Sequence, residues 1–175
     1  MKTASDNQGE EPTPAIPDSV KRLIHAAAAE VRSVNCFDFV PSDYEAVWDV
    51  LREIRGRFGE SAEPSFCEWG SGLGVVTGMA EILGFRASGI EIDATLAEQS
   101  RELLKGHGLQ ATVLTGSYLE MTHSADVIFV YCWPSRMVET EQHFIDAAPE
   151  NALLLICHGA SDVRCRTKVQ LSQDQ

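Results

Sequence analysis

The chain has 175 residues, 44% of them hydrophobic and 23% charged, with 26 acidic against 14 basic side chains and a formal net charge of −12. This length predicts one domain with a single core, and the composition is that of an ordinary globular protein. The negative charge repels phosphate backbones and anionic lipid surfaces, so we expect no nucleic acid and no membrane as partners. No apolar stretch approaches the roughly 20 residues that cross a bilayer, and the polar N-terminus has no signal-peptide pattern, so we expect a cytoplasmic protein.

The first 60 residues are predicted to hold a tail and two helices. Residues 1–17 are rich in acidic, amide and proline residues, so little burial offsets the entropy of ordering them and we expect a flexible tail. Asp18 is placed to cap a first helix, and Ser42 with Glu45 has the capping-box spacing that starts a second. Residues 18–60 are therefore predicted to form an N-terminal helical extension within a domain that spans 18–175.

Short apolar runs alternate with helix-length segments over the rest of the chain. The runs cover residues 65–68, 87–92, 111–114, 126–131 and 152–157. This is the βαβ rhythm of a parallel sheet with right-handed crossovers. Gly84 is expected to end the helix after the first run and Asp93 to cap the next helix. A further helix is expected to open at Pro134 or Ser135 and to stop at Pro149.

Residues 161–169 predict one last strand with a basic face. They alternate Val163, Cys165 and Thr167 with Arg164, Arg166 and Lys168. A charged edge strand that discourages aggregation explains this pattern, and contact with an acidic partner is the alternative.

The cysteines indicate neither a metal site nor a redox centre. They are odd in number and form no CxxC pair, so we expect buried free thiols at Cys36, Cys67, Cys132, Cys157 and Cys165. Two of them, Cys132 and Cys157, stand at predicted strand ends, but nothing in their sequence surroundings argues for a lowered thiol pKa.

The stretch FCEWGSGLG, residues 66–74, places three glycines between a predicted strand and a predicted helix. A helix that starts there presents unpaired backbone N–H groups that attract anionic groups. Gly70, Gly72 and Gly74 remove side chains from the turn, so a nucleotide-like ligand can lie against the main chain. Tight packing of the turn is the alternative reason for such glycines.

An acidic residue supports the ligand interpretation. Glu91, in GIEID, lies at the end of the second predicted strand, about 20 residues after the first glycine, where a carboxylate can accept hydrogen bonds from both ribose hydroxyls. The dinucleotide fingerprint GxGxxG would need a glycine at position 75, and the chain has Val75. The pattern therefore points away from NAD.

At these residues the sequence resembles the class I, seven-stranded S-adenosylmethionine-dependent methyltransferases. EWGSGLG is similar to the first motif of that family, and the likeness extends through GIEID, VLTGSYLE and VIFVYCWP to cover residues 41–160. PSDYEAVWDVL and GFRASGIEID are most similar to small protein-lysine methyltransferases. The resemblance implies a three-layer Rossmann-like α/β fold over residues 64–170, with a mostly parallel sheet and helices on both faces. The family completes its sheet with two antiparallel strands and only one is apparent here, so we expect a reduced C-terminal pair and keep a homodimer open.

The resemblance implies S-adenosylmethionine as the cofactor. The implied cofactor-binding residues are Glu68, Gly70, Ser71, Gly72, Gly74, Glu91, Ile92, Ser117 and Tyr118. The ammonium of the cofactor suits Glu68, its carboxylate suits helix N–H groups, and Glu91 would hold the ribose. Many relatives have an aspartate for the adenine amine after the third strand, where this chain has Gly116 and then Ser117.

The end of the fourth predicted strand, Tyr131-Cys132-Trp133-Pro134, is where the resemblance places acceptor residues. Relatives that methylate planar amide or base nitrogens often have Asn-Pro-Pro-Tyr there, so DNA-base and glutamine methylation lose support. Tyr131 and Trp133 could flank an amine or the sulfonium by cation–π attraction or could simply pack the sheet edge. His158, after the fifth run, could take a proton from the acceptor or could be a structural histidine. Tyr131, Trp133 and His158 are therefore the catalytic residues that we predict.

Three functions of different classes follow from these observations. The leading hypothesis is a methyltransferase that moves a methyl group to an amine or other nucleophile of a protein or small molecule by in-line displacement. Alignment alone supplies effective molarities of about 10⁵ to 10⁸ M, so no catalytic triad is required. The alternatives are a module that binds S-adenosylmethionine without turnover, favoured by Ser117 and the reduced strand pair, and an NAD-linked oxidoreductase, against which Val75 counts.

Overall fold

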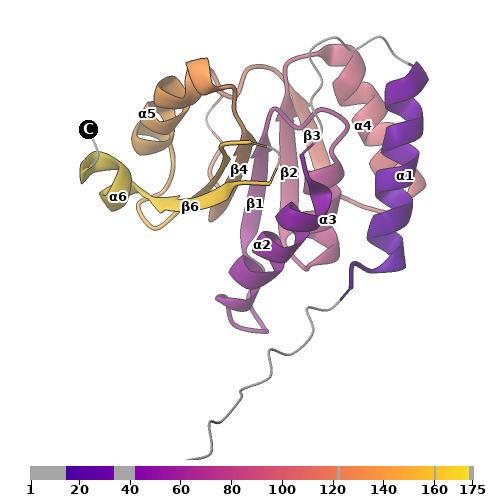
Figure 1. Ribbon diagram of the computed structural model, residues 1–175, viewed down its shortest axis with the longest axis horizontal. Helices are drawn as coiled ribbons and strands as arrows, with labels where there is room; N and C mark the ends of the chain where they lie inside the picture. Colours follow the sequence, from indigo (N-terminus) through magenta and orange to yellow (C-terminus); the bar gives the residue numbers. More distant parts are fainter. Residues whose placement is uncertain (1–14, 34–41, 122, 160, 174–175) are drawn as a thin grey trace, which may run out of the picture.

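The computed structural model describes residues 15–33, 42–121, 123–159 and 161–173 (Figure 1). The helices are α1 (Asp18–Ser33), α2 (Tyr44–Gly56), α3 (Val75–Ile82), α4 (Ala94–Gly106), the short 3₁₀ helix η1 (Pro134–Arg136), α5 (Met137–Ala147) and α6 (Lys168–Gln173). The strands are β1 (Ser65–Trp69), β2 (Arg86–Glu91), β3 (Thr112–Thr115), β4 (Val127–Tyr131), β5 (Leu153–Cys157) and β6 (Val163–Thr167).

The strands form one sheet in the order β3-β2-β1-β4-β5-β6. The first five pair in parallel, and β6 pairs antiparallel with β5. The mostly parallel sheet and the single antiparallel strand at its edge agree with the sequence prediction. Each predicted apolar run is a strand, because apolar side chains in these runs face helices on one side of the sheet or the other.

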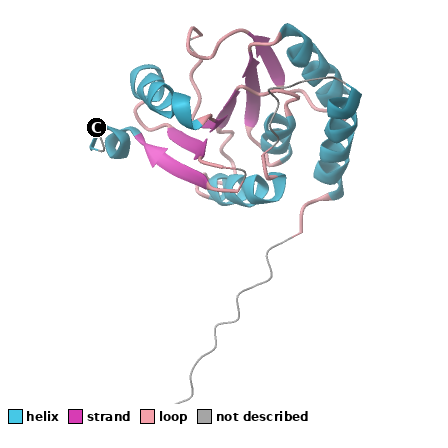
Figure 2. Ribbon diagram, turned by 45° about the horizontal axis from the view of Figure 1, so that its top comes forward, coloured by secondary structure: helices cyan, strands magenta, loops and turns pink. Residues whose placement is uncertain are grey.

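Helices cover both faces of the sheet, as predicted (Figure 2). On one face, α1, α2 and α3 pack in a cluster around Phe66, Phe129 and Leu155. On the other face, Phe144 of α5 and Leu171 of α6 pack against alternate residues of the same strands. The alternation follows from the period of two along a strand. The segment between β3 and β4, which is of helix length in the sequence, has a turn at residues 118–120 and no helix among its described residues.

Some local predictions are confirmed and others are wrong. Asp93 caps α4, and Gly84 follows α3 with a φ of 88°. Ser42 does not cap α2; the cap is Asp43, whose Oδ1 atom accepts hydrogen bonds from the N–H groups of Glu45 and Ala46 at 3.2 Å. Aspartate supplies the same kind of acceptor one residue later.

The end of the chain also differs from the prediction, because residues 168–169 belong to α6 and not to the last strand. Thr167 and Gln170 cap α6 reciprocally: the Thr167 N–H donates to Gln170 Oε1 at 2.9 Å, and the Gln170 N–H donates to Thr167 Oγ1 at 3.3 Å. This spacing is a capping box that the strand-like alternation concealed.

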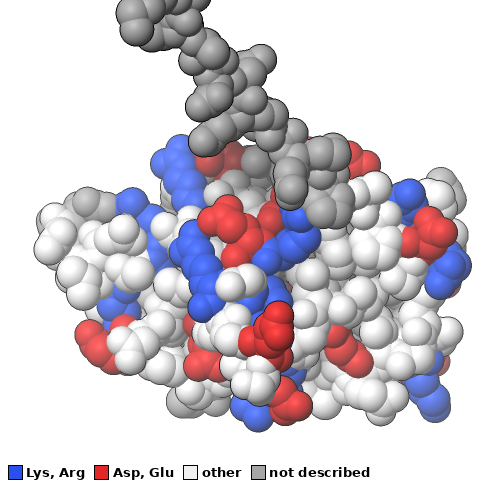
Figure 3. Space-filling view, turned by 90° about the horizontal axis from the view of Figure 1, so that it is seen from below, with Lys and Arg blue, Asp and Glu red and all other residues white. Residues whose placement is uncertain are grey.

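The distribution of charge is mixed at the face seen in Figure 3, where basic and acidic side chains interleave. Along α2 and its C-terminal cap, Arg57 pairs with Glu53 at 2.8 Å and Arg52 pairs with Asp49 at 3.3 Å. The net charge of −12 therefore does not make every face uniformly acidic.

Further predictions concern cysteines, metals and membranes. Cys67, Cys132 and Cys157 are free and buried, Cys165 is free and half-buried, and Cys36 lies outside the described residues.

Within the described part of the chain, no group of three or more histidine, cysteine, aspartate or glutamate side chains could hold a metal ion. No helix in that part is long and apolar enough to cross a membrane. Of the predicted tail, residues 1–14 lie outside the described residues. Asp18, predicted to cap α1 from outside, is instead the first residue of the helix and lies in its first turn.

Candidate functional site

The glycine-rich turn joins β1 to α3 at the carboxyl edge of the sheet. Gly70, Gly72 and Gly74 have φ values of 73°, 51° and 72°, in the left-handed region that other residues avoid. Gly74 is the N-cap of α3, which begins at Val75. The predicted order of strand, turn and helix is therefore confirmed, and all three glycines are required by backbone conformation.

The turn is tied to the end of β2. Ile90 accepts hydrogen bonds at its carbonyl oxygen from the N–H groups of Gly70 at 2.8 Å and Ser71 at 2.9 Å. The Oε2 atom of Glu91 accepts from the Gly72 N–H at 2.7 Å. Sequence reasoning placed Glu91 opposite the glycines, and the structure brings the two together, with Glu91 7% exposed.

Glu68, at the start of the motif, is buried with a partner that sequence reasoning missed. Its Oε2 atom accepts hydrogen bonds from the Thr77 N–H at 2.8 Å and the Thr77 hydroxyl at 2.6 Å. The pKa of Glu68 is raised to about 8: burial is the largest cause and the nearby Glu91 adds to the rise, whereas the two Thr77 hydrogen bonds oppose it. A cation next to Glu68 would favour its ionised form.

The two explanations for glycines in the turn apply at different positions. A Cβ atom at Gly70 would meet nothing within 4 Å, so open space lies beside that residue. A Cβ atom at Gly74 would overlap the Ser100 hydroxyl and lie 3.2 Å from Leu104 Cδ1, both on α4. The space at Gly70 thus suits a ligand, whereas Gly74 lets α3 and α4 pack closely.

The predicted adenine side of the site is formed by the ends of β2 and β3. The Gly116 N–H donates to the carbonyl oxygen of Glu91 at 2.8 Å, which joins these two strand ends. Ile92, which follows Glu91, is 72% exposed, and Ser117 is half-buried. An exposed apolar side chain next to a buried carboxylate suits a flat apolar ring.

Tyr118 lies differently from what a cofactor-binding role would suggest. Its ring stacks on Trp69 with centroids 5.0 Å apart and an interplanar angle of 7°. Its hydroxyl lies 3.1 Å from Thr140 Oγ1 on α5, within hydrogen-bonding distance. The half-buried side chain is therefore part of the packing between the sheet and α5.

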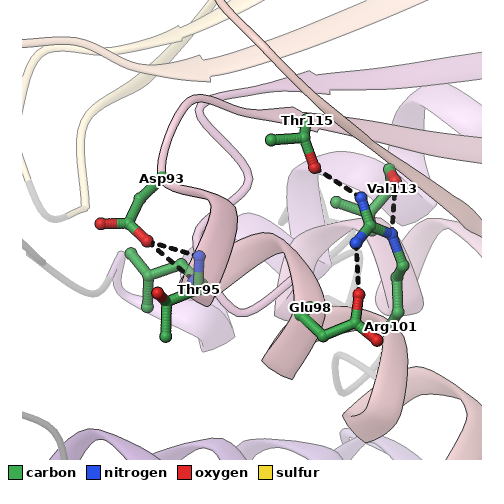
Figure 4. A network of polar contacts seen from close by, with 7 residues as sticks. Asp93, Thr95, Glu98, Arg101, Val113 and Thr115 are labelled. Carbon is green, nitrogen blue, oxygen red and sulfur yellow. Dashed lines mark hydrogen bonds and ion pairs between the residues drawn. The ribbon is translucent and has the colours of Figure 1, made fainter.

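A polar network holds α4 against β3 beside this part of the site (Figure 4). Arg101 donates from Nε to the Val113 carbonyl at 2.9 Å and from a terminal nitrogen to Thr115 Oγ1 at 2.6 Å. The Asp93 carboxylate caps the start of the same helix through the N–H groups of Thr95 and Leu96. Sequence reasoning identified the Asp93 cap but missed Arg101, because its acceptors lie 12 and 14 residues away.

The predicted catalytic residues follow the ends of β4 and β5, which are neighbours in the sheet. Tyr131 pairs in register with Cys157, so Trp133 and His158 come shortly after these paired positions. Trp133 is 54% exposed, Tyr131 is half-buried, and the N–H of His158 donates to the Asp162 carbonyl at 2.8 Å. Tyr131 ends β4, Trp133 and His158 follow strand ends, and these carboxyl ends share the edge of the glycine turn, where open parallel sheets bind ligands.

The cysteines at this edge are poor nucleophiles. Burial raises the pKa of the Cys157 thiol to about 12, and burial likewise raises the pKa of the Cys132 thiol. Thiols in this state are protonated near neutral pH, so neither provides a reactive thiolate.

Comparison with solved structures identifies methyltransferases of the same architecture. The chain is 24% identical to an RNA methyltransferase from Salinibacter ruber, solved with S-adenosylhomocysteine, at a TM-score of 0.58 over 67% of this chain and 76% of that one. A methyltransferase from Podospora anserina, also with bound S-adenosylhomocysteine, gives 15% identity and a TM-score of 0.65 over 83% of this chain and 64% of that one. A methyltransferase from Geobacter sulfurreducens gives 18% identity and a TM-score of 0.58 over 83% and 75%.

Sequence comparison finds no protein-family model and no curated protein that matches the chain. The strand order, the glycine turn and the likeness to solved structures together define the fold of the chain. The chain has the class I, Rossmann-like methyltransferase fold.

Proposed function

We propose that the protein is an S-adenosylmethionine-dependent methyltransferase that transfers a methyl group to an amine or other nucleophile of a protein or a small molecule. The observation that supports this proposal most is the turn without side chains, held between the buried carboxyl groups of Glu68 and Glu91. The solved structures of similar fold that contain S-adenosylhomocysteine add support for this cofactor.

The residues of the turn fit this cofactor. The open space beside Gly70 admits a ligand against the main chain, and Glu68 provides a carboxyl group for an ammonium. The carboxylate of Glu91 already accepts two hydrogen bonds from backbone N–H groups, and its remaining lone pairs could accept hydrogen bonds from ribose hydroxyls. The exposed Ile92 would cover one side of the adenine ring.

When bound, S-adenosylmethionine supplies a methyl group that is already activated by its sulfonium. The work left to the protein is to position the acceptor and to remove water and protons. Trp133 and Tyr131 would flank a cationic or neutral amine, with a cation–π contribution of about 0.5 to 2 kcal/mol. His158, at the end of the neighbouring strand, would receive the proton that a protonated amine must lose before it attacks.

Calorimetric titration with S-adenosylhomocysteine and S-adenosylmethionine tests cofactor binding. We expect saturable binding that Gly72→Val abolishes in a folded protein, since valine cannot adopt the φ of 51° without strain. No binding at millimolar concentration would refute the proposal, and binding of NADH instead would favour the oxidoreductase. Because the ligand ammonium favours ionised Glu68, binding below the pKa of about 8 should release a proton, visible as a dependence of the measured enthalpy on the buffer.

Transfer of a labelled methyl group separates an enzyme from a non-catalytic binder. We expect the wild-type chain to label a component of a lysate, either in the protein fraction or in the small-molecule fraction. Trp133→Ala should reduce this labelling while it leaves S-adenosylhomocysteine affinity within about twofold, because Trp133 is assigned to the acceptor side. Binding without any labelled acceptor would favour the module without turnover.

A further inference from the structure

Three consecutive residues of β2 shape the glycine turn, and we propose that the first of them, Gly89, is a positioning residue for cofactor binding. The carbonyl oxygen of Ile90 accepts hydrogen bonds from the N–H groups of Gly70 and Ser71. The carboxylate of Glu91 accepts a hydrogen bond from the N–H group of Gly72. Gly89 contributes by having no side chain. This inference rests on the proposed function, because it concerns the same cofactor turn.

The position of Gly89 in the sheet explains why a side chain there would matter. Gly89 pairs in parallel register with Glu68 of β1, and side chains at paired positions point to the same face of a sheet. A Cβ atom at position 89 would therefore project to the side on which Glu68 meets Thr77.

That space is already filled by the turn. The added Cβ would lie 2.7 Å from both Cβ and Oγ of Ser71 and 2.9 Å from Oγ1 of Thr77, closer than real Cβ contacts. Ser71 is 5% exposed and Thr77 is fully buried, so neither side chain can move aside into solvent. Gly89 is not among the glycines with positive φ, so this position demands space and not an unusual backbone conformation.

The methyl group of an alanine at position 89 would consequently disturb the surroundings of both carboxyl groups of the site, those of Glu68 and Glu91. Displacement of Thr77 would weaken its two hydrogen bonds to Glu68. Displacement of Ser71 would carry the next residue, Gly72, away from Glu91. Gly89 thus acts on the cofactor through the turn, without touching the cofactor itself.

The test compares Gly89→Ala with the double variant Gly89→Ala/Ser71→Gly in the full chain. We expect Gly89→Ala to bind S-adenosylhomocysteine at least about tenfold more weakly than wild type, because overpacking of a buried site shifts the backbone. The double variant should recover part of the affinity, since removal of the Ser71 side chain vacates the space that the alanine enters. Gly106→Ala is the control, because a Cβ at Gly106, the last residue of α4, meets nothing within 4 Å.

Urea unfolding of each variant checks that the protein measured is folded. If Gly89→Ala does not fold, Ser71→Val fills the same space from the turn side and should also weaken S-adenosylhomocysteine binding. A folded Gly89→Ala or Ser71→Val with wild-type affinity would overturn the inference. A weakened Gly89→Ala that the Ser71→Gly change does not improve would also overturn it, because the loss would then not pass through Ser71. Failure of the wild-type chain itself to bind would instead refute the proposed function.

Discussion

The Oε2 atom of Glu91 accepts a hydrogen bond from the backbone N–H of Gly72 at 2.7 Å, while Oε1 of the same carboxylate accepts from the Asp93 N–H at 2.9 Å. One side chain therefore joins the turn before α3 to the start of α4. Because Glu91 is 7% exposed and held at both oxygens, its orientation toward the turn is set before any ligand arrives.

Glu91→Gln should weaken S-adenosylhomocysteine binding by about tenfold or more. A glutamine has only one accepting oxygen, so it loses either the Gly72 or the Asp93 hydrogen bond, and hydrogen bonds to a charged group are worth about 1.5–3 kcal/mol. Calorimetric titration measures the change. Glu60→Gln, an exposed site in the segment between α2 and β1, is the control and should bind as wild type does. Unchanged affinity in Glu91→Gln would remove Glu91 from the site.

The raised pKa of Glu68 predicts that stability falls as pH rises. Between the ordinary carboxyl pKa of 4.5 and about 8, the native protein keeps a proton on Glu68 that the unfolded chain has lost. The native state then binds more protons, so the free energy of unfolding decreases with pH across this window, by at most about 1.4 kcal/mol per pH unit. Glu68→Gln carries no such proton, so the stability of wild type relative to this variant should fall from about pH 5 to about pH 8.

Urea unfolding of both proteins at several pH values in this window measures that difference. The comparison with Glu68→Gln cancels the titration of groups that the two proteins share. A difference that stays constant with pH would show that Glu68 titrates near its ordinary value in the native state.

Gly70→Ala and Gly108→Ala form a matched pair that separates backbone strain from ligand contact. The two glycines have φ values of 73° and 74°, and a Cβ at either position meets nothing within 4 Å. Each alanine should therefore lower the free energy of unfolding by a similar amount, about 1–2 kcal/mol. Only Gly70→Ala should also lose S-adenosylhomocysteine affinity, as measured by calorimetry, because Gly108 lies in the turn between α4 and β3. Equal affinities in the two variants would place the ligand elsewhere.

Arg101→Met should lower the free energy of unfolding by about 1–2 kcal/mol, because it leaves the Val113 carbonyl and the Thr115 hydroxyl without the guanidinium donor that links α4 to β3. Arg101→Lys should restore little, since one ammonium cannot reach the geometry of the planar fork. Urea unfolding measures both variants. Arg136→Met, which removes an exposed pair with Glu139, is the control and should cost less than about 1 kcal/mol. A cost for Arg101→Met equal to that of the control would mean that the network in Figure 4 adds no stability.

Several features of the site could be predicted from local sequence because local physics decides them. The positive φ values of Gly70, Gly72 and Gly74 require glycine, and the placement of Glu91 follows from the length of one βα unit. The Asp43 and Thr167 caps were missed, although aspartate before α2 and the Thr-x-x-Gln spacing before α6 are both visible in the sequence.

The amino-acid sequence by itself determined the α/β class and the alternation of strands and helices that makes a parallel sheet. Apolar periodicity and turn residues decide these features because they set local structure over a few neighbouring positions. Only the tertiary structure decided that Gly74 serves packing against Ser100 while Gly70 borders open space, and that Tyr118 stacks on Trp69. It likewise revealed Thr77 as the partner of Glu68 and Gly89 as the space that receives Ser71. These relations depend on which side chains from separate elements meet in a close-packed interior, and such contacts arise only when the sheet and its helices are assembled.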